Sequence, residues 1–238
     1  MDRFLVTILA FVILAATSCT EETSSLPTQE VPVELVPALV LTPSPSTPQA
    51  PARQLILPNP QRYFVNLDSV PFIRCGDVVG TAEIIDAGRV MTAAHVVGTS
   101  ATCMIGLSVA TVIENNTALD YAILSVTTSQ IHQKMRYSCA GFRTGQTYYA
   151  IGYAHGRDFA MTRLVATARF EDGTYHETGT PFYHTRVLDG EVFKGMSGGP
   201  IVNQDGVMVG ITSATSMGMR PKSLSRELKD TSICSSDK

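Results

Sequence analysis

From about Leu67 onward, the chain consists of short runs rich in β-branched residues, separated by Gly, Asn and Asp. Runs of this composition between turn-forming residues are typical of β-strands. Two of the separators, Asp86–Gly88 and Asn203–Gly206, have the composition of hairpin turns. The pattern therefore predicts an all-β barrel or sandwich, with Pro221–Asp230 as the one good candidate for a helix. The expected strands are Val70–Cys75, Val79–Ile85, Val90–Ala93, Met104–Val112, Tyr121–Val126, Thr147–Ile151, Leu164–Phe170, His184–Leu188, Ile201–Asn203 and Val207–Ser213.

The N-terminus has the features of an export signal. Phe4–Ala16 is an apolar run with Thr7 as its one polar residue, too short to span a bilayer comfortably and typical of the core of a signal peptide. It ends in Ala15–Cys19, where small residues before a lone cysteine resemble the cleavage box of bacterial lipoproteins. On this interpretation residues 1–19 are the signal peptide and Cys19 is acylated. Ordinary secretion and an uncleaved anchor are the alternatives, and all three imply export.

Residues 20–60 are rich in proline and poor in charge. They hold nine of the 13 prolines and only five charged residues. Dense proline disfavours helices and central strands and favours stiff, extended chain. We expect a disordered tether between a membrane surface and a folded domain at residues 61–238, with a propeptide as the alternative.

The overall charge excludes one class of partner. The chain carries a net charge of −3 and has no cluster of Lys and Arg that would neutralise several phosphates. We therefore expect no nucleic-acid partner.

The hexapeptide Gly195–Pro200 places Ser197 between glycines, directly before an apolar run. A serine hydroxyl becomes a good nucleophile only when a neighbouring base accepts its proton. Flanking glycines let the backbone turn sharply and direct amide N–H groups at a developing oxyanion. Taken alone, such a cluster is as often a plain surface turn, so the question is whether the chain also supplies a base.

Two upstream motifs supply a base and a group to orient it. His95 follows an apolar run that ends in small residues, and Asp120 stands at the start of another apolar run. Taken singly, His95 is as well explained as a core histidine and Asp120 as a loop residue. Glu114 is the other nearby acid, but it precedes two asparagines, and we expect it to be solvated in a polar loop.

Together, Thr92–His95, Leu119–Leu124 and Gly195–Pro200 resemble the chymotrypsin-like, or trypsin-fold, serine peptidases over roughly residues 68–220. The order His, Asp, Ser is the one found in chymotrypsin and differs from the orders of other triad folds. The resemblance implies two six-stranded antiparallel β-barrels with the active site between them and a short C-terminal helix. It places the division between the barrels near residues 127–140.

The resemblance also implies a role for each residue. Ser197 attacks the scissile carbonyl, His95 transfers the proton, and Asp120 orients and stabilises the imidazole. The backbone N–H groups of Gly195 and Ser197 form the oxyanion hole.

Met196 departs from the pattern of the digestive and clotting members. Those enzymes carry Asp directly before the serine, and a newly freed N-terminal amine pairs with it. Met196 cannot pair with an ammonium group, and bacterial members, including the heat-shock and glutamyl-endopeptidase branches, similarly lack this Asp. We therefore expect activity without such processing, which favours the tether over the propeptide.

The sequence gives few indications of the substrate specificity. Glu191 lies at the position where trypsin-like enzymes keep the acid that recognises Lys and Arg, although an exposed loop Glu is normally just solvated. Ser213, Ala214 and Thr215 are expected to form an edge strand that pairs with the substrate backbone. His184 either reaches the specificity pocket or is an ordinary strand residue.

Cysteines other than Cys19 number four, which permits three pairings in an exported domain. We favour Cys75–Cys103, which brackets the His95 segment, and then Cys139–Cys234, with free thiols as the alternative. No Cys-x-x-Cys pair and no histidine spacing suits a metal, so we expect neither a metal nor another cofactor.

Two functions follow from these observations. The leading one is an exported, surface-tethered serine endopeptidase of the bacterial cell envelope that cleaves protein or peptide substrates through an acyl-enzyme. It is anchored to the membrane by its N-terminal lipid or signal segment, and is otherwise secreted. The alternative is a non-catalytic surface binding domain with a protease-like fold, against which the complete triad argues.

Overall fold

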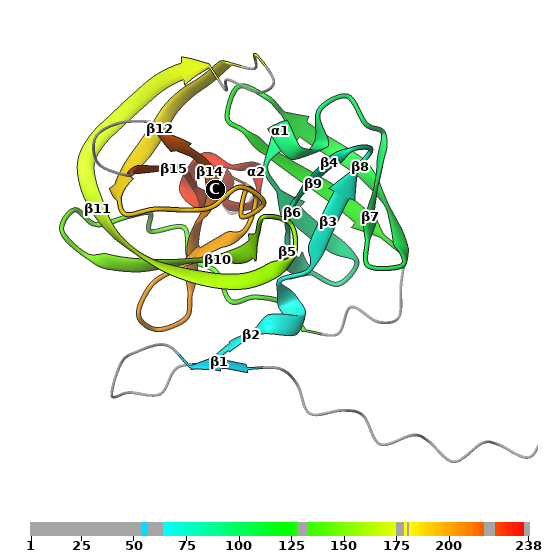
Figure 1. The fold of residues 1–238 in the computed structure, drawn as a ribbon, viewed down its shortest axis with the longest axis horizontal. Helices are drawn as coiled ribbons and strands as arrows, with labels where there is room; N and C mark the ends of the chain where they lie inside the picture. The colour runs from blue at the N-terminus through cyan, green and yellow to red at the C-terminus, as the bar shows by residue number, and fades with distance from the viewer. Residues whose placement is uncertain are drawn as a thin grey trace, which may run out of the picture. The chain divides into compact units, whose positions relative to one another are not determined.

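The computed structural model of the chain describes residues 54–56, 64–127, 133–174, 179, 181–216 and 222–235. All of these belong to one compact unit, Gln49–Lys238. Residues 1–19, including Cys19, and most of the proline-rich stretch lie outside the described residues. Figure 1 shows the unit as two curled antiparallel sheets formed by successive parts of the chain.

The first sheet has seven strands in the order β4-β3-β7-β8-β9-β6-β5. Only Ala82 separates β4 from β5, yet these two strands lie at opposite ends of that order. The sheet therefore curls until its two edges meet, and β4 and β5 are two halves of one bent strand. Counted in this way, it is a six-stranded barrel. The strands are β3 (Phe72–Cys75), β4 (Val78–Thr81), β5 (Glu83–Asp86), β6 (Arg89–Thr92), β7 (Thr102–Ile105), β8 (Ser108–Asn116) and β9 (Tyr121–Val126).

The second sheet is a closed barrel of six strands in the order β10-β11-β12-β15-β14-β13. Closure removes the free edges that an open sheet would leave unpaired. Its strands are β10 (Thr147–Ala154), β11 (Asp158–Thr174), β12 (Pro181–Asp189), β13 (Pro200–Val202), β14 (Met208–Ser216) and β15 (Lys222–Glu227). The two-barrel fold implied by the sequence is confirmed, with the division between β9 and β10.

In the part of the chain that the structure describes, helices are few and short. Within the described residues, the elements outside the two barrels are the paired strands β1 (Gln54–Ile56) and β2 (Phe64–Asn66), the 3-10 helices η1 (Leu67–Ser69) and η2 (Leu228–Asp230), and the helices α1 (Ala94–Val97) and α2 (Ser232–Ser235). Within the described part of the chain, no helix is long and apolar enough to cross a membrane.

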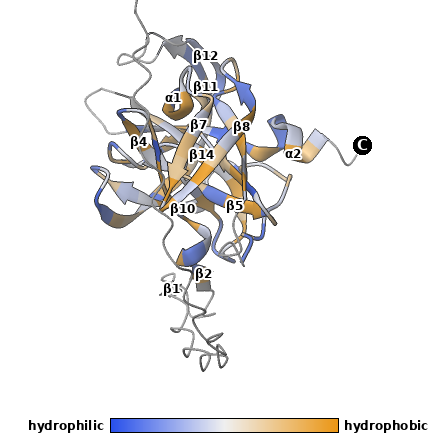
Figure 2. Cartoon of the chain, turned by 90° about the vertical axis from the view of Figure 1, so that its right-hand side faces the viewer, coloured by the Kyte–Doolittle hydropathy of each residue, from blue (hydrophilic) through white to orange (hydrophobic). Residues whose placement is uncertain are grey.

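Hydrophobic residues are frequent along the strands, as the colouring of β5 and β10 in Figure 2 shows. One buried cluster joins the two sheets, because it combines Ile85, Met91 and Ile123 of the first with Ile151 and Ile211 of the second. The barrels are thus packed face to face through a continuous apolar core. A fixed relation between the barrels matters for a site whose residues come from both.

The expected helix at Pro221–Asp230 is wrong. Lys222–Glu227 forms β15, which pairs with β12 on one side and β14 on the other. Its residues from Ser223 to Glu227 are all buried, so the closed barrel decides the conformation against the local helix propensity. The C-terminal helix that does form is α2.

A second correction concerns Met104–Val112, expected as one strand. It is divided between β7 and β8, which pair as a hairpin. Gly106 turns the chain between them with a φ of +59°, a conformation that glycine adopts easily. The Asp86–Gly88 and Asn203–Gly206 turns are confirmed as the connections of β5 to β6 and of β13 to β14.

Two disulfides cross-link the unit, and both are the pairs favoured from the sequence. Cys75 and Cys103 join β3 to β7 and pack in the apolar cluster that includes Val96 of α1. Cys139 and Cys234 join the segment before β10 to α2. The first bridge therefore supports the helix that carries His95.

Candidate active site

His95 and Asp120 are joined by three contacts. His95 Nδ1 lies 2.9 Å from Oδ1 and 3.1 Å from Oδ2 of Asp120. The backbone N–H of His95 also donates to Asp120 Oδ1, at 3.0 Å. An ionised carboxylate can only accept hydrogen bonds, so Nδ1 carries a proton and the ring is fixed in orientation. The arrangement leaves Nε2 as the ring atom available to act as a base.

Each partner is held by its own element. His95 lies on α1, directly after β6, and its side chain is 13% exposed, whereas that of Asp120 is completely buried. Asp120 ends the turn between β8 and β9 with a φ of +52°. Non-glycine residues adopt this left-handed conformation rarely, so it requires support from the surrounding structure.

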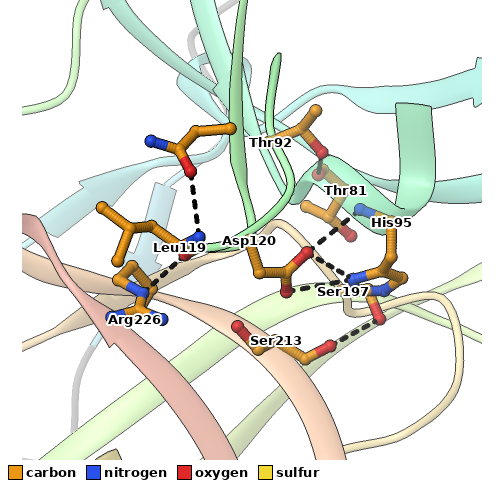
Figure 3. Close-up of polar contacts among 9 residues, drawn as sticks. Thr81, Thr92, His95, Leu119, Asp120, Ser197, Ser213 and Arg226 are labelled. Atoms are coloured by element: carbon orange, nitrogen blue, oxygen red, sulfur yellow. Dashed lines mark hydrogen bonds and ion pairs between the residues drawn. The ribbon is translucent and has the colours of Figure 1, made fainter. Parts of the chain in front are cut away.

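Arg226 of β15 provides part of that support from the second barrel. Its guanidinium is buried and donates through Nε to the carbonyl oxygen of Leu119, at 2.5 Å. It also donates to the carbonyl oxygens of Tyr183 and His184 at the start of β12. The Leu119 N–H donates to Asn116 Oδ1, at 3.0 Å. Both the N–H and the carbonyl group of Leu119, the residue before Asp120, are thus hydrogen-bonded (Figure 3).

Ser197 belongs to the loop between β12 and β13. Its hydroxyl donates to the carbonyl oxygen of Ser213, at 3.3 Å. A Cβ atom added at Gly80 would contact both Val96 and the carbonyl oxygen of Ser197, so the Ser197 backbone lies against the helix of His95. Figure 3 shows the Ser197 hydroxyl and the His95 imidazole at one end of the cluster. The structure thus brings together the three residues singled out from the sequence.

The glycines on both sides of Ser197 are required by close packing. Gly195 has a φ of +90°, and a Cβ atom there would lie 2.4 Å from the carbonyl oxygen of Tyr153. Gly198 has a φ of +80°, and a Cβ atom there would lie 2.1 Å from Thr92 Oγ1. Any side chain at either position would displace the loop that carries Ser197.

Two carbonyl groups of this loop are held by backbone N–H groups of neighbouring segments. The Lys194 oxygen accepts the His155 N–H at 2.5 Å, and the Ser197 oxygen accepts the Thr81 N–H at 2.9 Å. In a trans peptide the N–H points opposite to the C=O, so the Gly195 N–H is directed away from His155. Among the described residues, neither the Gly195 nor the Ser197 N–H donates to a backbone carbonyl.

Met196 is completely buried, in an apolar cluster with Leu188 and Ile201. Its sulfur accepts the N–H of Phe193, at 3.4 Å. An apolar side chain therefore fills the position at which the digestive members carry an aspartate.

Of the specificity candidates, Glu191 is exposed in the loop after β12. His184 is an exposed residue of β12, and its ring stacks on the ring of Phe170 with the two centroids 4.2 Å apart. Ser213, Ala214 and Thr215 lie on β14, which pairs with β13 only as far as Ile211. The next residue, Thr212, is still bonded on this side, because its N–H donates to the Gly199 carbonyl oxygen and its own carbonyl oxygen accepts the Gly198 N–H. Beyond Thr212 the described strands cover one side of β14, through β15, and no described strand pairs with the other edge.

A recess of about 610 Å³ lies elsewhere on the second barrel, between residues 138–148 and Asn203–Asp205. His95, Asp120 and Ser197 are not among the residues that line this recess. Within the described residues, no group of three or more His, Cys, Asp or Glu side chains is arranged to hold a metal ion.

Glu83 on β5 and Tyr121 on β9, both in the first barrel, have shifted pKa values. Burial raises the pKa of the Glu83 carboxyl well above its usual range, and among the described residues neither carboxyl oxygen has a hydrogen-bond partner. Burial, followed by the hydrogen bond to Glu114, raises the pKa of Tyr121. Glu114 is therefore not a solvated loop residue as expected, because it lies on β8 and accepts hydrogen bonds from Tyr121 and Ser232.

Comparison with known proteins identifies the class. The family model described as a trypsin-like peptidase domain matches residues 80–211, more than half of the chain. The chain therefore belongs to the trypsin-like peptidase family, and this identifies it as a serine endopeptidase. No curated protein sequence matches it significantly.

Among solved structures, the Rv3671c protease of M. tuberculosis in its active form is 25% identical, with a TM-score of 0.58 over 67% of this chain and 76% of that one. Its inactive form is 27% identical, with a TM-score of 0.55 over 66% and 83% of the two chains. The HtrA-type protease AlgW, solved with a tripeptide, is 21% identical, with a TM-score of 0.57 over 68% and 57%. This last likeness shows the fold alone.

Proposed function

We propose that the chain is an exported, surface-tethered endopeptidase in which His95, Asp120 and Ser197 form the catalytic triad. One observation carries the assignment: a fully buried carboxylate holds both the ring Nδ1 and the backbone N–H of His95. A histidine held in this way presents Nε2 as a base, as the triad chemistry requires. Ser197, beside it in a tight glycine turn, is the nucleophile.

The reaction proceeds by acyl transfer. Ser197 Oγ bonds to the scissile carbonyl carbon while its proton passes to His95 Nε2, and the carbonyl oxygen becomes an oxyanion. The Gly195 and Ser197 N–H groups stabilise that charge. Collapse of the intermediate breaks the C–N bond, and His95 returns the proton to the leaving amine. Water, activated by His95, then hydrolyses the acyl-enzyme by the same steps.

Substrate binding uses the unpaired edge of β14. A peptide in extended conformation can add to the Ala214–Ser216 segment as a further strand, through main-chain hydrogen bonds. This mode places the scissile bond beside Ser197, because the neighbouring Ser213 carbonyl contacts the Ser197 hydroxyl. Peptide is bound in the AlgW structure named above, which supports a peptide substrate here.

Export and tethering are supported by the N-terminal sequence and by the cysteines. The apolar run, the small residues before Cys19 and the proline-rich stretch form the pattern of a lipid-anchored protein on a tether. Two disulfides in one small domain suit an oxidising compartment. Labelling of growing cells with radioactive palmitate tests this: the chain should be labelled and the Cys19→Ala variant should not, and equal labelling would rule out acylation at Cys19.

The activity is tested with fluorescein-labelled casein and the purified chain. We expect cleavage by the wild-type chain and none by the Ser197→Ala variant, which removes only the nucleophile. Cleavage by both proteins would show that another residue is responsible. Absence of cleavage by either, with both folded, would favour the non-catalytic binding domain.

A further inference from the structure

Thr81, the last residue of β4, connects the first barrel to both sides of the nucleophile. It is completely buried. Its N–H donates to the Ser197 carbonyl oxygen at 2.9 Å, and its hydroxyl lies 2.8 Å from the Gly195 carbonyl oxygen. The hydroxyl also accepts the N–H of Tyr153 on β10, at 2.9 Å. One residue of the first barrel thus contacts three backbone groups of the second.

The direction of these hydrogen bonds is fixed by chemistry. The Tyr153 N–H can only donate, and the Thr81 hydroxyl has a single proton. That proton must therefore point to the Gly195 oxygen, which can only accept. The carbonyl of Thr81 in turn accepts the Thr92 hydroxyl at 2.7 Å, so the end of β4 is itself anchored (Figure 3).

These contacts control the peptide planes around Gly195. The plane before Gly195 is fixed at the Lys194 oxygen by the His155 N–H. The plane after it is fixed at two places: the Gly195 oxygen accepts the Thr81 hydroxyl, and the Met196 N–H donates to the Phe193 carbonyl oxygen at 3.0 Å. Gly195 has no side chain to restrict its backbone, so the direction of its N–H depends on these hydrogen bonds, and the Thr81 hydroxyl supplies the one that comes from the first barrel.

We propose that the Thr81 hydroxyl is a positioning group for the oxyanion hole. It holds the Gly195 carbonyl group in place. It thereby fixes the backbone angle at Gly195 that directs the Gly195 N–H toward the same oxyanion as the Ser197 N–H. The inference rests on the proposed triad mechanism and adds a residue that does not touch the substrate. It predicts an effect on the chemical step rather than on substrate binding.

The test compares Thr81→Ser with Thr81→Ala, because these two variants differ only in the hydroxyl. Valine is unsuitable, since it would place a methyl group where an oxygen now lies 2.8 Å from the Gly195 carbonyl. The readouts are kcat and KM for a fluorogenic peptide chosen from a cleaved peptide library. A further readout is the rate of phosphorylation by diisopropyl fluorophosphate, a small probe with few demands on side-chain specificity.

We expect Thr81→Ala to lower kcat and the phosphorylation rate by about tenfold or more, with KM changed by less than about threefold. Thr81→Ser should stay within about threefold of wild type in all three. The matched control is the pair Thr231→Ser and Thr231→Ala. Thr231 is also buried and donates through its hydroxyl to a carbonyl oxygen, that of Leu228, at 2.7 Å. Its variants should lose similar thermal stability but keep wild-type kcat.

Equal kcat for Thr81→Ala and Thr81→Ser would overturn the proposal, as would a Thr81→Ala defect confined to KM or thermal stability. If Thr81→Ala does not fold, Thr81→Cys replaces it, because a thiol is a weak donor. A kcat for Thr81→Cys equal to that of Thr81→Ser would likewise overturn it. A wild-type chain that neither cleaves peptide nor reacts with the fluorophosphate would instead refute the proposed function itself.

Discussion

The Asp120 carboxylate accepts hydrogen bonds from two donors of His95, the ring Nδ1 at 2.9 Å and the backbone N–H at 3.0 Å. The backbone contact fixes the start of α1, and the ring contact fixes the tautomer. In the proposed mechanism, this one buried carboxylate would both orient the base and stabilise the imidazolium that the base becomes.

Replacing this carboxylate by an amide tests both functions. Asp120→Asn keeps the shape but allows the side chain to donate, so that the wrong imidazole nitrogen is protonated. We expect kcat to fall by about 10³-fold to 10⁴-fold, with the protein still folded. Asp77→Asn, in the exposed turn after β3, is the control and should have no effect. Activity of Asp120→Asn near the wild-type value would exclude Asp120 from the triad.

Arg226 should affect activity through Asp120. Arg226→Met removes the donors to Leu119, and a small shift of the neighbouring Asp120 is expected to lower kcat by about tenfold to a hundredfold. Asn116→Ala removes the other support of Leu119 and should act in the same direction. Steady-state kinetics on active-site-titrated protein measure the effect. Wild-type kcat in both variants would show that Asp120 needs neither support.

Met196 should make activity independent of N-terminal processing. Because an apolar side chain fills this position, no freed amine is needed to order the nucleophile loop. A chain extended at its N-terminus by an affinity tag should have the same kcat before and after removal of the tag. Met196→Asp should be inactive, because it buries an unpaired carboxylate in an apolar cluster, at a cost of several kcal/mol. Activity that appears only after N-terminal cleavage would contradict this interpretation.

Glu83 should make folding stability depend on pH. Its pKa is raised in the folded state by burial, so folding takes up a proton once the pH exceeds the ordinary value of 4.5. The contribution of this group is thus complete below about pH 4.5 and is lost as the pH rises, by at most about 1.4 kcal/mol per pH unit.

Urea unfolding at a series of pH values measures this dependence. Glu83→Gln carries no titrating group, so its free energy of unfolding should fall less between pH 5 and 8 than that of wild type. Asp77→Asn, exposed in its turn, should follow the wild-type curve. Identical slopes for wild type and Glu83→Gln would mean that the Glu83 carboxyl is not neutral in the folded chain.

Some of this site could be predicted from the sequence because its motifs are local. Ser197 stands between glycines, and His95 and Asp120 adjoin apolar runs, so each position carries a recognisable short pattern. Thr81 and Arg226 carry no such pattern. Thr81 contacts Gly195 across 114 positions of sequence, and Arg226 contacts Leu119 across 107. Contacts of this range follow from the packing of the two barrels, which no short segment encodes.

The same reasoning applies to the fold. The Tyr121–Val126 strand was predictable to the residue, because its apolar residues form one run, which the structure buries except at Ser125. Lys222–Glu227 contains residues that favour helices, and only its two neighbouring strands in a closed barrel make it β15. Prediction from local propensity thus fails for a segment that lies between strands from distant parts of the sequence.

The central claim is that Ser197 is a nucleophile activated by His95. The most direct measurement is the reaction of the folded wild-type chain with diisopropyl fluorophosphate, followed by peptide mass spectrometry to locate the adduct. We predict a single phosphoryl adduct on Ser197, absent after denaturation before labelling and reduced at least about 10³-fold in rate by His95→Ala. An adduct on another residue, or equal labelling of Ser197→Ala, would contradict the assignment of Ser197 as the nucleophile.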